Sequence, residues 1–276
     1  MTKTSFTAEP GKPEVLGNYA SVNGLKLYYE IHGDGRPLVL LHGGVGASEM
    51  FTPLLPALAA SRQVIAVHLQ GHGRTADVDR PFSFGLMADD IAGLLKQLDI
   101  ISADILGYSL GGGVALQTTI RHPELVHRLV LVSAPFKRQG FYPEVLKSFD
   151  QMGPEAARFM DQSPLSQLYP GKNWAALFTR IGVLQRQEYD WSKGVAGIKS
   201  PVMLVYADAD AIQPGHMLEF FTQLGGGQRD AGLDGSGRPA ARLAILPGMT
   251  HYDILTFPGL AAIIDSFLDA PAPVDL

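Results

Sequence analysis

The chain has 276 residues, of which 46% are hydrophobic and 18% are charged, so a filled interior is possible and a disordered chain is excluded. The formal net charge is −5 and no basic block is present, which argues against nucleic acid as the main partner. Cysteine is absent, which excludes disulfides, thiolate metal sites and a cysteine nucleophile.

Residues 1–17 are polar and contain Pro10, Gly11 and Pro13, so we expect a loose leader rather than a signal peptide. No apolar run approaches the ~20 residues that span a bilayer. We therefore expect a cytoplasmic protein without a membrane span. Its oligomeric state, monomer or dimer, stays open.

Short apolar runs bounded by turn residues predict strands at residues 19–22, 25–31, 37–41, 63–67, 103–106, 128–132, 201–206 and 243–246. Helical periodicity and capping residues predict helices at residues 48–60, 84–98, 114–120, 214–224 and 258–268. Ser48 and Ser83 are the expected N-caps of the first two helices. Strands that alternate with helices indicate a mostly parallel sheet with helices on both of its faces.

The pattern changes between residues 136 and 199, where short helical pieces are broken by prolines and glycines. We expect residues 1–135 and 200–276 to form one α/β core and residues 136–199 to form a helical cap over the sheet. Most aromatic residues of this insertion are expected to form its own small core. We expect Trp174 and Trp191, with Tyr108 of the core, to line a substrate pocket.

The most informative stretch is Gly107-Tyr108-Ser109-Leu110-Gly111, which follows an apolar strand and precedes a helical pattern. A turn this sharp holds its serine in a strained conformation, and a Cβ at Gly107 or Gly111 would collide with neighbouring elements. Ser109 is therefore the predicted nucleophile. The next helix directs its free N–H groups at the same place.

A serine hydroxyl needs a base, and the base needs a carboxylate to fix its tautomer. His251 follows the last strand in a Gly-x-x-His loop, so we expect it to be the base. Two acids follow the strand before it. We favour Asp210, because a residue deeper in the loop can reach the next loop, and Asp208 would then cap its own turn.

The glycine loop at residues 42–46 follows the first buried strand, and its glycines let backbone N–H groups face a ligand. We expect the N–H groups of Leu110 and Gly44 to form an oxyanion hole. A tight strand-to-helix turn is the simpler interpretation of this loop, and both can hold. His42 is expected to shape it.

These motifs resemble the α/β-hydrolase superfamily over residues 19–268. The matching residues are His42-Gly43-Gly44, Gly71-His72-Gly73-Arg74-Thr75, Gly107–Gly112, His122-Pro123-Glu124, Asp208–Asp210 and Pro247–His251. The resemblance implies the α/β-hydrolase fold with a helical cap, and it places nucleophile, acid and base at Ser109, Asp210 and His251. His68 and Gln70 stand where relatives usually have Asp and Arg. Because of this departure, the salt bridge that the resemblance implies for the loop at residues 71–75 is in doubt.

The expected activity is hydrolysis of small to medium apolar carboxylic esters through an acyl-enzyme, without a metal or cofactor. A lactonase, an amidase, a C–C bond hydrolase or a perhydrolase on the same triad is the alternative. Ser109 disfavours epoxide and carbon–halogen hydrolysis, because relatives with those activities carry Asp there. A non-catalytic receptor of the same fold is a third hypothesis, against which the intact Ser, Asp and His argue.

Overall fold

The structure is a computed structural model that describes residues 17–271. The predicted leader lies outside them, apart from Gly17. The strands are β1 (Gly17–Val22), β2 (Leu25–His32), β3 (Arg36–Leu41), β4 (Arg62–Val67), β5 (Ala103–Tyr108), β6 (Val126–Val132), β7 (Val202–Ala209) and β8 (Arg242–Thr250). The α-helices are α1 (Leu55–Leu58), α2 (Phe84–Gln97), α3 (Leu110–Arg121), α4 (Pro143–Asp150), α5 (Pro164–Leu168), α6 (Trp174–Arg186), α7 (Ser192–Val195), α8 (Pro214–Gln223) and α9 (Leu260–Leu268). The 3-10 helices are η1 (Ser48–Phe51), η2 (Pro123–Leu125), η3 (Arg138–Gly140), η4 (Glu155–Gln162) and η5 (Ile254–Thr256).

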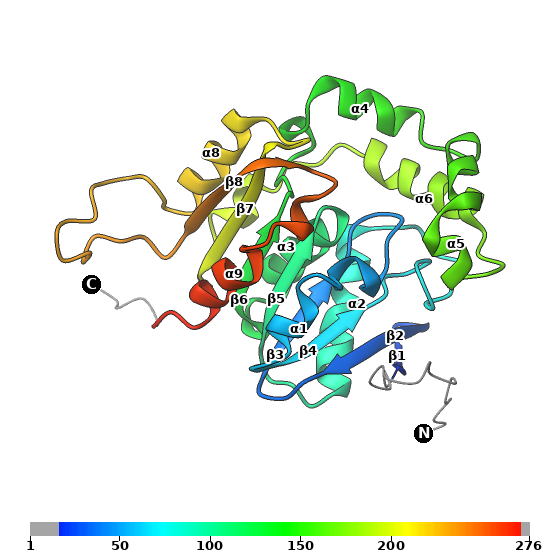
Figure 1. Cartoon of the computed structure of the whole chain (residues 1–276), viewed down its shortest axis with the longest axis horizontal. Coiled ribbons are helices and arrows are strands. Elements are labelled where there is room, and N and C mark those ends of the chain that lie inside the picture. The colour runs from blue at the N-terminus through cyan, green and yellow to red at the C-terminus, as the bar shows by residue number, and fades with distance from the viewer. Residues whose placement is uncertain (1–16, 272–276) are drawn as a thin grey trace.

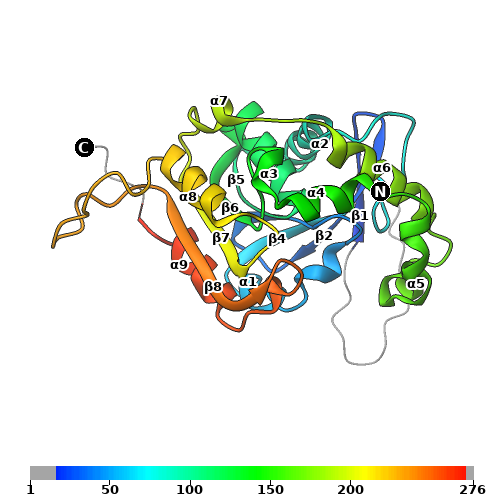
Figure 2. The ribbon, with the colours of Figure 1, turned by 90° about the horizontal axis from the view of Figure 1, so that it is seen from above.

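The strands form one sheet of order β1-β2-β4-β3-β5-β6-β7-β8. The pairs β1–β2 and β2–β4 are antiparallel, and all later pairs are parallel. Figure 2 shows α2 and α3 over one face and α1 and α9 over the other. The expected mostly parallel sheet with helices on both faces is confirmed.

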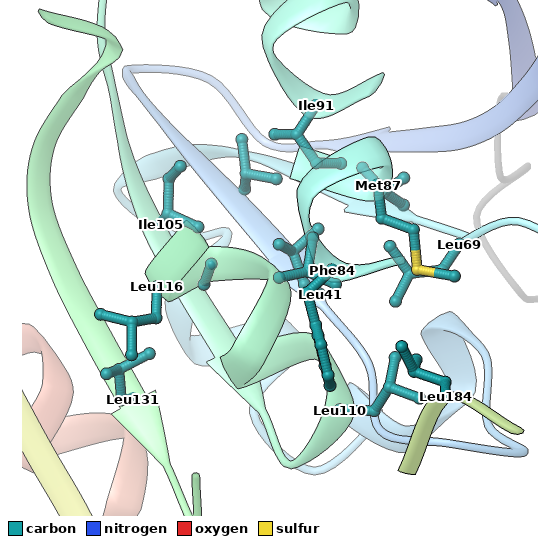
Figure 3. Packing of buried hydrophobic residues seen from close by; sticks show 14 of the residues in the cluster. Leu41, Leu69, Phe84, Met87, Ile91, Ile105, Leu110, Leu116, Leu131 and Leu184 are labelled. Carbon is teal, nitrogen blue, oxygen red and sulfur yellow. The ribbon is translucent and has the colours of Figure 1, made fainter. Parts of the chain in front are cut away.

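Both faces of the central strands are buried, because successive side chains point to opposite faces. On β3, Val39 and Leu41 join the core under α2 and α3, and Leu38 and Leu40 join the core under α1 and α9. Figure 3 shows the first of these cores, in which Phe84 and Ile91 of α2 pack toward the sheet. This packing fixes the ends of the parallel strands in space.

The single helix expected at residues 48–60 is wrong. The segment forms η1 and the one-turn α1, because Pro53 cannot donate a backbone hydrogen bond and interrupts the helix. Ser48 does not cap a helix, since the residue before η1 is Ala47 and no side chain caps it. The predicted cap at Ser83 is confirmed by its bond from the N–H of Leu86.

The residues between β6 and β7 contain α4, α5, α6 and α7 and no strand of the sheet. Figure 1 shows α4, α5 and α6 grouped at one end of the molecule, beyond the sheet. None of the helices within residues 17–271 has both the length and the hydropathy that crossing a membrane requires.

Candidate active site

Ser109 lies between β5 and α3 at φ 53° and ψ −117°, in the left-handed half of conformational space. A Cβ built on Gly107 would lie 2.3 Å from the oxygen of Gly111, and one on Gly111 would lie 2.2 Å from the oxygen of Leu41. Neither glycine can carry a side chain there, as the sequence predicts. The close packing of β5, α3 and β3 holds the serine in a strained turn.

Three side chains that are far apart in sequence meet beyond the carboxyl ends of the strands. Nε2 of His251 lies 3.0 Å from Oγ of Ser109, and Nδ1 of His251 lies 2.9 Å from Oδ1 of Asp210. The carboxylate accepts from Nδ1–H, so Nε2 is left to accept the serine proton. This is the geometry that a serine nucleophile requires of its base.

The carboxylate of Asp210 is fully buried and accepts hydrogen bonds on both oxygens. Besides His251, the Oγ of Ser133 donates to it at 2.5 Å and the N–H of Ala207 at 3.0 Å. Burial raises the pKa of Asp210, but the contacts with His251, then Ser133 and Ala207, outweigh burial and hold the pKa below its usual value. The acid is thus kept ionised beside the imidazole.

Asp208 has a different position from the one we expected. It does not cap its own turn, because its carboxylate accepts from the N–H groups of Gly248 at 2.9 Å and Met249 at 3.2 Å. These residues lie near the end of β8, directly before His251. Asp208 therefore holds the segment that leads to the base, and Asp210 contacts the base itself.

The glycine loop is held by His42. The N–H of Leu69 donates to Nε2 of His42, so Nδ1 carries the proton and donates to the carbonyl of Gly43 at 2.8 Å. The N–H of Gly46 donates to the same carbonyl. Two donors on this oxygen fix the Gly43–Gly44 peptide, whose N–H points to the opposite side.

Gly44 faces the nucleophile turn, since a Cβ built on it would lie 3.6 Å from the side chain of Leu110. Within residues 17–271, neither the N–H of Gly44 nor that of Leu110 donates to another protein group. Leu110 is the first residue of α3, where a helix leaves its N–H groups free. Both groups are available to a ligand.

Histidine side chains support the loop after β4. His68 accepts from the N–H of Arg74 at Nδ1 and donates from Nε2 to Oγ of Ser48 at 2.8 Å. Burial, the largest cause, lowers the pKa of His42 to about 4, lowers that of His68 further, and holds that of His72 well below its usual value. Neutral histidines thus support this loop.

Helix α6 packs against the glycine loop and the loop after β4. Leu177 approaches Gly71 in the loop after β4, and Ile181 approaches Gly44, with 3.7 and 3.8 Å between the leucine or isoleucine carbons and a Cβ built on the glycine. Leu184, one turn later, joins the buried cluster that includes Leu110 (Figure 3). Leu177, Ile181 and Leu184 thus give α6 an apolar stripe on the side of the glycine loop and Leu110.

The three residues predicted to line a pocket have diverse positions. Trp174 begins α6 and is buried. Trp191 stacks on Tyr189, and both line a cavity of about 260 Å³ beside α2 and α3. The hydroxyl of Tyr108 donates to the carbonyl of His251 at 2.7 Å. A pocket role for them stays a prediction.

Sequence reasoning missed Ser133, the bond of Ser48 to His68, and the bonds of Asp208 to Gly248 and Met249. Ser133 has φ 51°, a strained position directly after β6, but nothing in its sequence neighbourhood shows that it faces a residue 77 positions later. Its place at a strand end was the available signal. Within residues 17–271, no group of three His, Asp or Glu side chains is arranged to hold a metal ion.

The comparisons with known proteins agree with this geometry. Residues 36–186 match the family described as alpha/beta hydrolase fold. The protein named as carbamate hydrolase RutD of Azorhizobium caulinodans is 30% identical over 72% of this chain and 83% of its own. A pimeloyl-[acyl-carrier protein] methyl ester esterase of Neisseria meningitidis is 34% identical over 67% of this chain and 79% of its own.

Among solved structures, carboxylesterase CesB from Bacillus subtilis superposes with a TM-score of 0.72 at 22% identity, covering 93% of this chain and 92% of that one. This likeness concerns the fold. Taken with the matched family, it shows that the chain belongs to the alpha/beta hydrolase family.

Proposed function

We propose that the protein is a serine hydrolase that cleaves carboxylic esters of small to medium apolar substrates through an acyl-enzyme. The observation that carries the proposal is the continuous hydrogen-bonded chain Ser109–His251–Asp210 at 3.0 and 2.9 Å. The relative named as a methyl ester esterase supports an ester as the substrate. In this proposal, residues 136–199 form the cap.

In the first half-reaction, Oγ of Ser109 bonds to the ester carbonyl carbon and its proton passes to Nε2 of His251. The charge on the carbonyl oxygen is stabilised by the N–H groups of Leu110 and Gly44. The intermediate then releases the alcohol, which takes the proton from His251. Asp210 accepts from Nδ1–H throughout and stabilises the imidazolium.

In the second half-reaction, water attacks the acyl carbon and gives one proton to His251. Release of the carboxylic acid returns that proton to Oγ of Ser109. Each proton is handled by one imidazole, so the protein needs no further acid or base for this chemistry.

The test is labelling with a fluorophosphonate together with assays of short p-nitrophenyl esters. We expect wild-type protein to label at Ser109 and to turn over the esters. Ser109→Ala is expected to lose the label and on the order of 10⁶-fold in kcat. Wild-type protein that is folded, yet neither labels nor cleaves any ester, would contradict the proposal.

A second candidate is hydrolysis of a carbamate, which the 30% identity to the protein named as RutD favours. A carbamate carbonyl can be attacked by the same serine and held by the same N–H groups. A panel of matched esters, carbamates, lactones and amides distinguishes these substrate classes by kcat/KM.

A further inference from the structure

Tyr108, the last residue of β5, is a buried tyrosine directly before the proposed nucleophile. Successive side chains of a strand point to opposite faces of the sheet. Leu106 and Tyr108 therefore join the core under α1 and α9, whereas Ile105 joins the core under α2 and α3. His251 lies on the connection from β8 to α9. The alternation along β5 thus turns the ring of Tyr108 toward the segment that carries the proposed base.

The hydroxyl of Tyr108 holds the backbone of His251. It donates to the carbonyl of His251 at 2.7 Å, and the centroid of its ring lies 5.6 Å from that of the imidazole. Within residues 17–271, no other protein group donates to this carbonyl. The N–H groups that Asp208 accepts from lie two and three residues earlier, at Met249 and Gly248. The tyrosine therefore anchors the base at the residue itself.

The ring of Tyr108 also contacts the glycine loop. A Cβ built on Gly43 would lie 2.8 Å from Cε1 of Tyr108, so a side chain at position 43 would collide with the ring. The peptide between Gly43 and Gly44 carries one of the N–H groups proposed for the oxyanion hole. One side chain thus contacts the segments of the base and of this donor, and its own backbone leads directly into Ser109.

The hydroxyl of Tyr108 stays protonated at the pH values at which a histidine can act as a base. Burial, the largest cause, and then the negative charge of Asp210 raise the pKa of Tyr108 far above its usual value. Since a carbonyl oxygen can only accept, the tyrosine is the donor of this bond. The anchor of His251 is therefore not lost by ionisation near neutral pH.

We propose that Tyr108 is a positioning residue, whose hydroxyl fixes the backbone of His251 so that Nε2 stays within reach of Oγ of Ser109. This inference rests on the proposed function, in which Nε2 takes the serine proton. Asp210 orients the imidazole through Nδ1, and Tyr108 holds the backbone from which the imidazole extends. The 3.0 Å contact between Nε2 and Oγ needs both, because a general base acts only within hydrogen-bond distance.

Tyr108→Phe tests the proposal, because it removes the hydroxyl and keeps the ring against Gly43. We expect kcat for short p-nitrophenyl esters to fall about 3- to 10-fold, the factor that corresponds to one net hydrogen bond. KM should stay within twofold, because the base acts in the transition states of both half-reactions and not in substrate binding. An unchanged kcat overturns the proposal.

Tyr206→Phe is the matched control. Tyr206 is a fully buried tyrosine of β7 whose hydroxyl donates to the carbonyl of Ala134 at 3.0 Å. The change removes the same kind of bond without altering the contacts of His251. It should lower the melting temperature as Tyr108→Phe does, but it should leave kcat within twofold. Equal losses of kcat in the two variants overturn the proposal, because the effect would then follow stability.

A measurement without substrate separates this inference from the proposed function. Amide hydrogen exchange, followed by mass spectrometry, reports local opening of the segment at residues 249–257. We expect exchange in this segment to be about 3- to 10-fold faster in Tyr108→Phe than in the wild type, and unchanged in Tyr206→Phe. Faster exchange in a protein that cleaves no ester supports the anchor and contradicts the proposed function. Equal exchange in all three proteins overturns the positioning role.

Discussion

The hydroxyl of Ser133, at the end of β6, donates a 2.5 Å hydrogen bond to Oδ2 of Asp210, in the loop after β7. The two strands are neighbours in the sheet, so the bond joins adjacent strand ends. The oxygen that accepts from Ser133 is the one that His251 does not use. Ser133 thereby orients the acid of the proposed triad from behind.

Ser133→Ala should reduce kcat by about tenfold, because a hydrogen bond to a charged group contributes about 1.5–3 kcal/mol and part of this remains through Ala207. Loss of the donor raises the pKa of Asp210. The fall of kcat/KM on the acid side of the pH profile should therefore begin at a higher pH. Thr119→Val removes another buried hydroxyl bond, within α3, and serves as the control. An unchanged pH profile in Ser133→Ala would show that Ser133 does not act on the acid.

Asp208, near the end of β7, and Asp210, directly after it, are separable by kinetics. Asp210→Asn leaves the imidazole in the wrong tautomer, so we expect kcat to fall on the order of 10⁴-fold. Asp208→Asn keeps one acceptor for the loop N–H groups and should cost less than tenfold. Steady-state assays of both variants, with circular dichroism to verify folding, check this order. A reversed order would assign the acid to Asp208.

Replacement of His42 should lower kcat more than it changes KM. His42→Phe keeps the ring volume but removes the bond to the carbonyl of Gly43, which frees the peptide that carries the N–H of Gly44. Full loss of an oxyanion donor costs about 10²- to 10³-fold, so a displaced donor should cost about 10- to 100-fold in kcat. His32→Phe, at the end of β2, is the control. Equal effects of the two changes would refute a positioning role for His42.

Stability should fall in mild acid. Burial lowers the pKa of His42 and of His216 to about 4, whereas an unfolded histidine titrates near 6.5. The unfolded state therefore binds more protons between these values, and stability that is complete above about pH 6.5 is lost as the pH falls toward 4. Each such histidine contributes a loss of about 2 kcal/mol between pH 7 and pH 5.

Urea unfolding of wild-type and His216→Phe protein at pH 7 and pH 5 measures this effect. The variant should lose about 2 kcal/mol less than the wild type over that interval. Phe220→Leu, which alters the same aromatic cluster without removing a titrating group, should show the wild-type dependence. Parallel pH dependences in all three proteins would contradict the proposed linkage.

The meeting of Ser109, Asp210 and His251 could be predicted because each residue directly follows a strand, and parallel strands end at one edge of the sheet. The need for glycine at positions 107 and 111 could also be predicted, because a side chain at either position would collide with neighbouring elements. The apolar periodicity of residues 48–60 predicts one helix, but Pro53 within this segment indicates that the helix is interrupted.

Contacts between separate loops could not be predicted. The bonds of Ser48 to His68 and of Tyr108 to the carbonyl of His251 depend on side-chain directions that no local pattern encodes. The extent of β8 was also underestimated, because it continues through Pro247 and Gly248 to Thr250. Pro247 is tolerated there because β8 is an edge strand, with one side free of hydrogen-bonded neighbours.

The helical segment leaves the sheet at the end of β6 and re-enters it at β7, and these strands are adjacent partners. Because these two strands are parallel, the segment crosses from the carboxyl end of β6 to the amino end of β7. The serine, the N–H groups of Gly44 and Leu110, and the imidazole come from other connections. Replacement of this helical segment during evolution can therefore change which substrate is bound without altering the residues proposed to cleave it.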